Sequence, residues 1–168
     1  IIHNDDRGFF YEIYNQERVL ATGCDWAFVQ DNLAESSMGV LRGLHFQEGE
    51  YAQAKLVTVL EGEIYDVCLD LRPDSSTYGK WEGFLINGKN KRQLFVPRGF
   101  AHGYLVTSSK ASVYYKVDNP YNKQSEGGIF YNDPELSIDW ARFLKSKPLL
   151  SEKDKLWPSL AEYSHNQV

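Results

Sequence analysis

The chain has 168 residues and a formal net charge of −5, with 42% hydrophobic and 14% aromatic residues. This length suits a single domain and provides enough apolar side chains to bury a core without disulfide bonds. The aromatic content excludes a disordered chain, and the acidic balance argues against a general nucleic-acid binder.

In chain order, the expected elements are mostly strands. A short helix is expected over residues 15–20, and runs of β-branched and aromatic residues predict strands over residues 56–60, 63–71, 81–86, 93–96, 103–106 and 111–117. Two more short helices are expected over residues 139–145 and 151–156, with Ser151 as a cap for the second. Evenly spaced strands favour an all-β sandwich or barrel, so we expect residues 1–168 to form one all-β domain with short peripheral helices.

The two cysteines and the start of the chain bear on its location. Cys24 and Cys68 are too few for a disulfide framework or a zinc site, so we expect free thiols in a reducing compartment, the cytoplasm. No apolar run reaches the roughly 18–20 residues of a membrane helix, and no secretory leader is evident. Because the chain begins at Ile1 and its only methionine is Met38, we expect an N-terminal piece to precede it.

Two histidines stand beside glycines near the ends of expected strands. His45 begins a strand-like segment after a polar loop, and His102 follows the tight turn of residues 97–99. An imidazole titrates near neutrality, so either can act as a general base if the two meet in the mouth of a barrel. Each can equally be a hydrogen-bonded structural histidine.

The turn Pro-x-Gly-x-x-His at residues 97–102 matches half of the metal-binding pattern of cupin barrels. The other half requires His-x-His followed by Glu, whereas this chain has His45-Phe46-Gln47. Because Gln is a poor ligand for zinc or iron, we expect no metal dependence.

Fixed positive charges point to an anionic ligand. Arg7, Arg42, Lys55 and Arg98 lie next to glycine turns or on expected strands, where a cationic side chain can meet a phosphate. Ordinary surface charge is the alternative for each of them.

Phenols and carboxylates add possible acids and partners for a base. Tyr115 and Tyr121 offer a proton donor or a flat face for stacking, with core packing as the alternative. Asp66, Asp70 or Asp154 can orient a histidine, although each can also be exposed or cap a turn. No nucleophile elbow, P-loop or GxGxxG motif occurs in the chain.

Eight motifs follow one another along the chain. They are Asp6-Arg7-Gly8-Phe9-Phe10, Phe28-Val29-Gln30-Asp31-Asn32, Val40-Leu41-Arg42-Gly43-Leu44-His45-Phe46-Gln47, Gln53-Ala54-Lys55-Leu56-Val57, Asn90-Lys91-Arg92-Gln93-Leu94, Pro97-Arg98-Gly99-Phe100-Ala101-His102-Gly103, Asp133-Pro134 with Ile138-Asp139-Trp140, and Leu150-Ser151-Glu152-Lys153-Asp154. With them the chain closely resembles the dTDP-4-dehydrorhamnose 3,5-epimerase family, over essentially its whole length.

The resemblance implies a fold and an activity. The fold is a cupin-type double-stranded β-helix, or jelly roll, that forms a homodimer and uses neither metal nor organic cofactor. The reaction is epimerisation of dTDP-4-keto-6-deoxy-D-glucose at C3 and C5, through an enolate, to dTDP-4-keto-L-rhamnose on the way to dTDP-L-rhamnose.

The resemblance also implies a role for each matching residue. It makes His45 the base, Asp154 its carboxylate partner, Tyr115 the acid on the other face of the sugar and Lys55 the charge beside the C4 oxygen, with Asp66 orienting Lys55. The substrate-binding residues that it implies, besides Lys55, are Arg7, Phe10, Glu12, Gln30, Asp31, Asn32, Arg42, His102, Tyr121, Glu126 and Lys153.

The chain departs from the family pattern at a few positions, and two alternative functions stay open beside the 3,5-epimerase. Leu33 replaces a frequent histidine, Asn119-Pro120-Tyr121 replaces a pair of aromatics, and most of the family's first strand is expected upstream of Asp6. One alternative is a relative that epimerises only C3 or only C5 of a related dTDP-keto sugar. The other is a cupin that binds sugar nucleotides without catalysis, which should lack the base or the acid.

Overall fold

The computed structural model describes residues 1–24 and 26–165. The strands are β1 (Ile2–Asp5), β2 (Gly8–Tyr11), β3 (Gln30–Ser37), β4 (Leu41–Gln47), β5 (Lys55–Glu61), β6 (Glu63–Asp70), β7 (Trp81–Asn87), β8 (Gln93–Val96), β9 (Phe100–Val106), β10 (Lys110–Val117) and β11 (Glu126–Gly128). The α-helices are α1 (Gln16–Leu20) and α2 (Leu160–His165), and the 3-10 turns are η1 (Gly49–Tyr51), η2 (Lys123–Ser125), η3 (Trp140–Arg142) and η4 (Lys153–Lys155).

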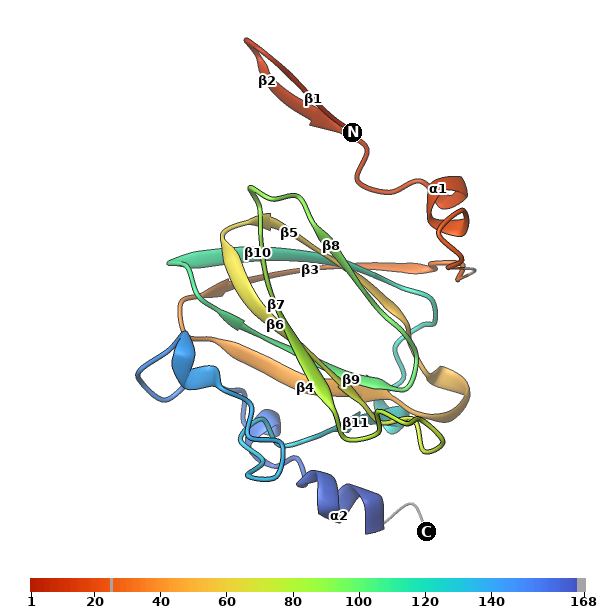
Figure 1. Cartoon of the computed structure of the whole chain (residues 1–168), viewed down its shortest axis with the longest axis vertical. Helices are drawn as coiled ribbons and strands as arrows, with labels where there is room; N and C mark the ends of the chain where they lie inside the picture. Colours follow the sequence, from red (N-terminus) through yellow and green to blue (C-terminus); the bar gives the residue numbers. More distant parts are fainter. Residues whose placement is uncertain (25, 166–168) are drawn as a thin grey trace.

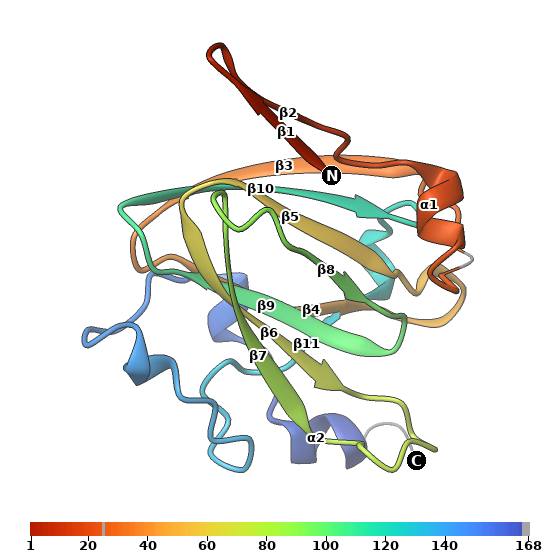
Figure 2. The ribbon, with the colours of Figure 1, turned by 45° about the horizontal axis from the view of Figure 1, so that its top comes forward.

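Two antiparallel sheets face each other and form the body of the molecule (Figure 1). One has four strands in the order β3-β10-β5-β8, and the other has five in the order β11-β4-β9-β6-β7. Some strands that are neighbours in the chain, such as β4 and β5, lie in different sheets, whereas β6 and β7 pair within one sheet. This arrangement is a cupin-like jelly roll, so the expected all-β fold is confirmed. The hairpin of β1 and β2 is separate and projects above the four-stranded sheet (Figure 2).

Alternation along the strands decides which side chains meet between the sheets. In β3 the even-numbered residues, such as Asn32 and Ser36, are more buried, and the odd-numbered ones, such as Leu33, are exposed. Burying each valine or isoleucine between the two sheets stabilises the fold by about 1.5–3 kcal/mol. The core cluster between the sheets consists of Val57, Val59, Ile64, Cys68, Ile86, Val96, Tyr104, Val106, Ala111 and Val113.

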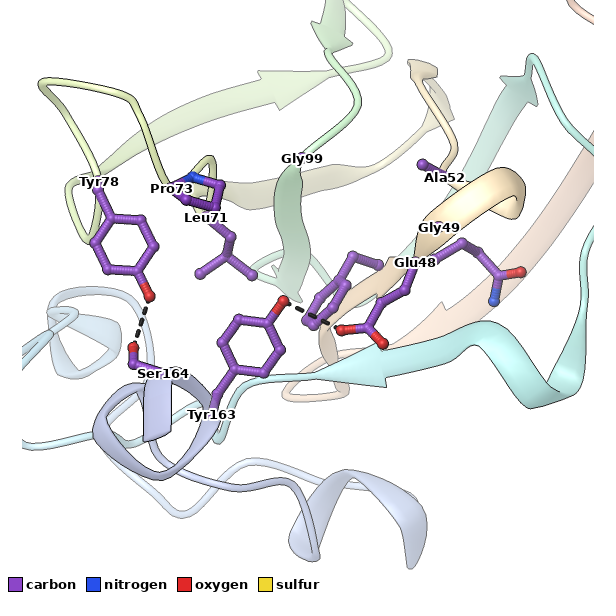
Figure 3. A pocket seen from close by; sticks show the side chains of 11 residues that line it. Glu48, Gly49, Ala52, Leu71, Pro73, Tyr78, Gly99, Tyr163 and Ser164 are labelled. Atoms are coloured by element: carbon purple, nitrogen blue, oxygen red, sulfur yellow. Dashed lines mark hydrogen bonds between the residues drawn. The ribbon is translucent and has the colours of Figure 1, made fainter. Parts of the chain in front are cut away.

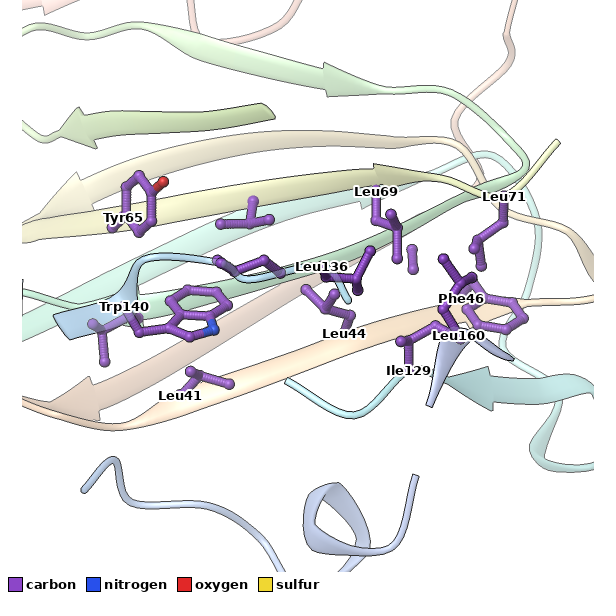
Figure 4. Packing of buried hydrophobic residues seen from close by; sticks show 14 residues of the cluster. Leu41, Leu44, Phe46, Tyr65, Leu69, Leu71, Ile129, Leu136, Trp140 and Leu160 are labelled. Atoms are coloured by element: carbon purple, nitrogen blue, oxygen red, sulfur yellow. The ribbon is translucent and has the colours of Figure 1, made fainter. Parts of the chain in front are cut away.

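A second core cluster covers the outer face of the five-stranded sheet (Figure 4). Leu44 and Leu69 of the sheet pack in one cluster with Trp140 and Leu160 from the C-terminal segments. The indole of Trp140 donates a hydrogen bond to the carbonyl of Tyr131 at 2.8 Å, which fixes that segment. Strand β6 is therefore buried on both faces and does not alternate between apolar and polar residues.

The expected elements are largely present, with corrections at the short ones. Helix α1 is capped by Asn15, and the Ser151 hydroxyl accepts a hydrogen bond from the Asp154 amide at 3.1 Å, as its capping role predicts. The expected helices over 139–145 and 151–156 are each only a single 3-10 turn, because these segments pack as irregular chain against the sheet. None of the described helices is long and apolar enough to cross a membrane.

Strands β3 and β4, the N-terminal hairpin and helix α2 were not expected from the sequence pattern. The polar inner face of β3 and the glycine in β4 hide their strand character. As a result His45 lies near the end of a strand and not, as expected, at the start of one.

Candidate active site

Polar side chains gather at one end of the space between the sheets. Lys55 opens β5, Tyr115 lies on β10, and His102 and Tyr104 lie two apart on β9. Residues two apart in a strand share a face, so inward positions that hold valines elsewhere hold these groups here. A cavity of about 140 Å³ is lined by Ala34, Arg42, His45, Lys55, His102, Tyr104, Val113 and Tyr115.

Strand β4 contributes two side chains to the cavity through a β-bulge. Arg42 and His45 are three apart and would point to opposite faces of a regular strand. Arg42 pairs with Tyr104, whereas His45 pairs with His102, so three steps along β4 match two steps along β9. Gly43, with φ of 132°, adopts a backbone conformation that other residues rarely reach. The bulge therefore turns both Arg42 and His45 toward the cavity.

His45 is held by a carboxylate. Its Nε2 lies 2.5 Å from Oδ1 of Asp154, which is buried in η4. Burial raises the pKa of Asp154, but hydrogen bonds from His45, Ser151 and Trp157 outweigh it, and the net pKa is lowered. Asp154 is thus a carboxylate at neutral pH, and it fixes the imidazole so that Nδ1 is free of this contact.

Lys55 places a positive charge beside His45. Its Nζ donates a hydrogen bond to the backbone carbonyl of His45 at 3.3 Å. Burial lowers the pKa of Lys55 to about 8, against the opposing charge of Asp66. The site therefore holds an ammonium with little hydration, which is available to stabilise an oxyanion.

Tyr115 faces the histidines from the other sheet. Burial raises the pKa of its phenol, while the guanidinium of Arg42 opposes the rise. The Nε of Arg42 donates a hydrogen bond to the Ser36 hydroxyl at 3.1 Å, which orients the guanidinium. Tyr115 therefore carries a proton at neutral pH.

His102, which lines the cavity, forms a buried pair with Asp66. The imidazole Nε2 lies 3.0 Å from Oδ2 of Asp66, on the neighbouring strand β6. The sequence interpretation made Asp66 the residue that orients Lys55. Its hydrogen-bond partner is His102, however, and its charge acts on Lys55 without a hydrogen bond between them.

A second group of expected substrate residues forms a connected rim. The Tyr121 hydroxyl donates to Glu126 at 3.0 Å, and Lys153 donates to the other oxygen of Glu126 at 2.6 Å. Gln30 accepts from the Tyr121 amide at 3.2 Å and donates to Asn32 at 2.9 Å. The rim reaches His45 and Asp154, because Gly128, two residues after Glu126, pairs with His45 and Lys153 precedes Asp154.

Four expected substrate residues lie elsewhere in this chain. Arg7 pairs with Asp5 between β1 and β2, Phe10 is 71% exposed on β2, and Glu12 follows that hairpin and pairs with Arg18. Asp31 is on the outward face of β3 and pairs with Lys116.

Arg98, a candidate from the charge pattern, pairs with Asp118 and lies over the Trp26 ring.

Two residues of the site escaped the sequence interpretation. Tyr104 lines the cavity two positions after His102, and this spacing alone could have placed it on the same face. Trp157 packs edge-on against His45 with ring centroids 6.0 Å apart, and its indole donates to Asp154 at 3.3 Å. No sequence motif indicates that Trp157 belongs to the site, because the turn η4 that precedes it brings it there.

A larger cavity of about 770 Å³ lies away from these groups, between α2 and the sheet edge (Figure 3). Its polar contacts include Tyr163 to Glu48 at 3.1 Å and Tyr78 to Ser164 at 2.6 Å. None of the catalytic or substrate-binding residues expected from the sequence lines this cavity, so the volume of a cavity does not identify the site here.

Metal-ligating residues do not converge in the part of the chain that the structure describes: no three His, Cys, Asp or Glu side chains could hold one ion. Gln47, which stands at the position of a cupin ligand, is buried and accepts a hydrogen bond from the amide of Asn122 at 2.8 Å. Gln47 therefore fixes the backbone next to Tyr121 of the rim.

Comparison with known proteins gives consistent matches. The sequence model of dTDP-4-dehydrorhamnose 3,5-epimerase matches residues 1–162. The dTDP-4-dehydrorhamnose 3,5-epimerase of Escherichia coli K12 is 50% identical over 157 residues, covering 92% of this chain and 83% of the relative.

Solved structures agree with this match. A dTDP-6-deoxy-D-glucose-3,5-epimerase from Legionella pneumophila, in complex with dTDP-4-keto-L-rhamnose, has a TM-score of 0.91 at 46% identity, covering 96% of this chain and 85% of that one. A 3′-monoepimerase from Streptomyces bikiniensis, in complex with dTDP-quinovose, has a TM-score of 0.92 at 31% identity, covering 99% and 84%.

Proposed function

The chain belongs to the dTDP-4-dehydrorhamnose 3,5-epimerase family, and we propose that its cavity epimerises dTDP-4-keto-6-deoxy-D-glucose at C3 and C5 to dTDP-4-keto-L-rhamnose. One observation carries the proposal: an imidazole paired with a carboxylate and a protonated phenol line one cavity from facing sheets. An epimerase needs this arrangement, since a proton must leave one face of the sugar and return to the other.

The C4 ketone makes the protons on C3 and C5 acidic. His45 takes such a proton, and the electron pair of the C–H bond moves into an enolate whose charge rests on the C4 oxygen. The Lys55 ammonium stabilises that oxygen. Tyr115 then gives its proton to the carbon from the opposite face, which inverts the centre.

Asp154 supports the base in two ways. Its carboxylate fixes the orientation and tautomer of His45, and its charge stabilises the imidazolium that forms. Trp157 excludes water from one side of the pair by packing against the imidazole.

The rim supplies the contacts for the nucleotide. The Tyr121 ring is 51% exposed and available to stack on thymine, and Lys153 lies beside it. Arg42 and His102 bind the sugar and the pyrophosphate. Gln30 and Asn32 complete the nucleotide contacts.

Turnover of dTDP-4-keto-6-deoxy-D-glucose in D₂O, followed by position-resolved NMR, tests the proposal. Wild-type protein should incorporate deuterium at both C3 and C5, and His45→Ala should abolish exchange at both, because one base serves both centres. His165→Ala, an exposed histidine at the end of α2, is the matched control and should exchange normally.

The same spectra separate the alternatives. Deuterium at one carbon only would indicate a single-centre epimerase, as in the 3′-monoepimerase relative. Binding without exchange would indicate a sugar-nucleotide-binding protein. Exchange retained at either carbon by His45→Ala would refute the assignment of the base.

The assembly that we propose is a homodimer. Phe9 and Phe10 of the projecting hairpin are 57% and 71% exposed, and Leu33 on the outer face of β3 is 67% exposed. In a two-fold dimer the hairpin of one copy can reach the cavity of the other, which would bring Arg7, Phe10 and Glu12 to the substrate. The free thiols Cys24 and Cys68 fit a cytoplasmic location.

A further inference from the structure

The cavity contains a hydroxyl that the mechanism above does not use. Tyr104 is 5% exposed, and its hydroxyl makes no hydrogen bond with any residue that the structure describes. Leaving a buried donor unpaired costs free energy, and phenylalanine would fill the same volume without that cost. A hydroxyl kept under these conditions points to a partner that exists only during the reaction.

The surroundings of Tyr104 indicate which partner this is. Tyr104 pairs across the sheet with Arg42 on one side and Asp66 on the other, and Tyr115 packs against the same core cluster. Ser36 lies close enough to lower the pKa of Tyr104, but its hydroxyl accepts from Arg42 and makes no regular hydrogen bond with Tyr104. The titratable and charged groups around the two phenols are Arg42 from β4, His45 from β4, Lys55 from β5, Asp66 from β6 and His102 from β9.

The two phenols differ in how firmly they hold their protons. Burial raises the pKa of Tyr104 to about 12, and the nearby Tyr115 adds to the rise. Arg42 lowers the pKa of both phenols. Tyr104 therefore keeps its proton at neutral pH and is available as a hydrogen-bond donor.

We propose that Tyr104 is a positioning residue for the proton donor: once Tyr115 has passed its proton to the sugar carbon, the Tyr104 hydroxyl donates a hydrogen bond to the Tyr115 oxygen. This rests on the proposed function, in which Tyr115 is the acid. In that step the O–H bond of Tyr115 breaks, a C–H bond forms, and the electron pair stays on the Tyr115 oxygen. Tyr104 keeps its own proton, and exchange with solvent returns a proton to Tyr115 and removes one from His45 before the second centre reacts.

The first test measures Tyr115 without substrate. Full-length protein labelled with 3-fluorotyrosine, whose phenol is more acidic, is titrated by ¹⁹F NMR, and the Tyr115 signal is assigned by its loss in Tyr115→Phe. Tyr104→Phe should raise the pKa of Tyr115 by about one unit, because the phenolate loses a donor. Tyr114→Phe, next to it on the outward face of β10, should leave the pKa unchanged. An unchanged or lower pKa in Tyr104→Phe would overturn the proposal.

The second test is a double-mutant cycle on turnover. Tyr104→Phe should lower kcat about tenfold in the wild-type background and leave it unchanged in the Tyr115→Phe background, because Tyr104 acts through Tyr115. An equal loss in both backgrounds would overturn the proposal. If the wild-type protein turns over no substrate, the proposed function fails, and the titration still decides whether the two phenols are coupled.

Discussion

Lys55 shows how one side chain affects both the activity and the stability of the molecule. Its pKa of about 8 in the folded chain lies below the ordinary 10.5, with burial as the main cause. The charged ammonium is therefore less favourable in the folded chain than in the unfolded one. This cost is fully present below pH 8 and disappears as the pH rises from 8 toward 10.5.

Replacing Lys55 by Met should stabilise the protein and abolish turnover. At pH 7 we expect the free energy of unfolding to rise by roughly 2 kcal/mol, because a poorly solvated charge is removed. The rate should fall at least about 100-fold without the ammonium at the enolate oxygen. Urea unfolding and kinetics at pH 7 and pH 10 measure both effects.

The stability that Lys55→Met gains over wild type should be smaller at pH 10 than at pH 7, because wild-type Lys55 is then largely uncharged. For the same reason, wild-type kcat should decline above about pH 8 as Lys55 loses its proton. A variant that is less stable than wild type at pH 7 would contradict this account of Lys55.

At the scale of an element, the bulge in β4 determines the geometry of the site. Without it, strand alternation would send Arg42 or His45 into the outer core. Gly43 packs directly against β9: a Cβ at this position would lie 2.5 Å from Cα of Gly103 and 2.9 Å from the carbonyl oxygen of His102. Both the positive φ and this contact require glycine.

Gly43→Ala should therefore destabilise the fold by about 2 kcal/mol or more and lower kcat through displacement of His45. Gly49→Ala is a matched control, because Gly49 also has a positive φ, 59°, but no atom lies within 4 Å of its Cβ position. It should cost only about 1 kcal/mol and leave kcat unchanged. Thermal unfolding and initial rates test the pair, and similar losses for both variants would contradict the role of the bulge.

At the scale of the whole molecule, the hairpin of β1 and β2 is the feature that the single chain does not explain. It pairs only with itself in the described sheets and carries Arg7 and Phe10 away from the cavity. A short isolated hairpin is marginally stable in water, so contact with a second copy would stabilise it.

Complementation between subunits tests this arrangement. His45→Ala chains lack a base, and Arg7→Ala chains lack a hairpin contact, so each homodimer should be impaired. Heterodimers, co-expressed and purified through two different tags, should recover about half of the wild-type activity, because one of their two sites is complete. Absence of recovery, or a monomer in sedimentation analysis, would contradict the exchange of hairpins.

Much of the fold could be predicted where local pattern decides structure. The strands from residue 55 to 117 follow from β-branched and aromatic runs between turn residues, and their bounds differ from the expected ones by at most three residues. The missed strand β4 contains Gly43, and the expected helix over 139–145 became one turn because Trp140 packs into the outer core. Local pattern does not report such tertiary contacts.

The sequence by itself determined the all-β class and the family, and it singled out His45, Lys55, Tyr115 and Asp154 as the proposed reactive groups, because motifs and residue chemistry are local properties. Only the tertiary structure decided that Asp154, 109 residues from His45, lies 2.5 Å from it, and that Asp66 pairs with His102. It also decided that the Tyr104 hydroxyl is buried at the cavity with no hydrogen-bond partner among the described residues. Distances, burial and pKa values depend on which strands become neighbours, and packing of the two sheets sets that.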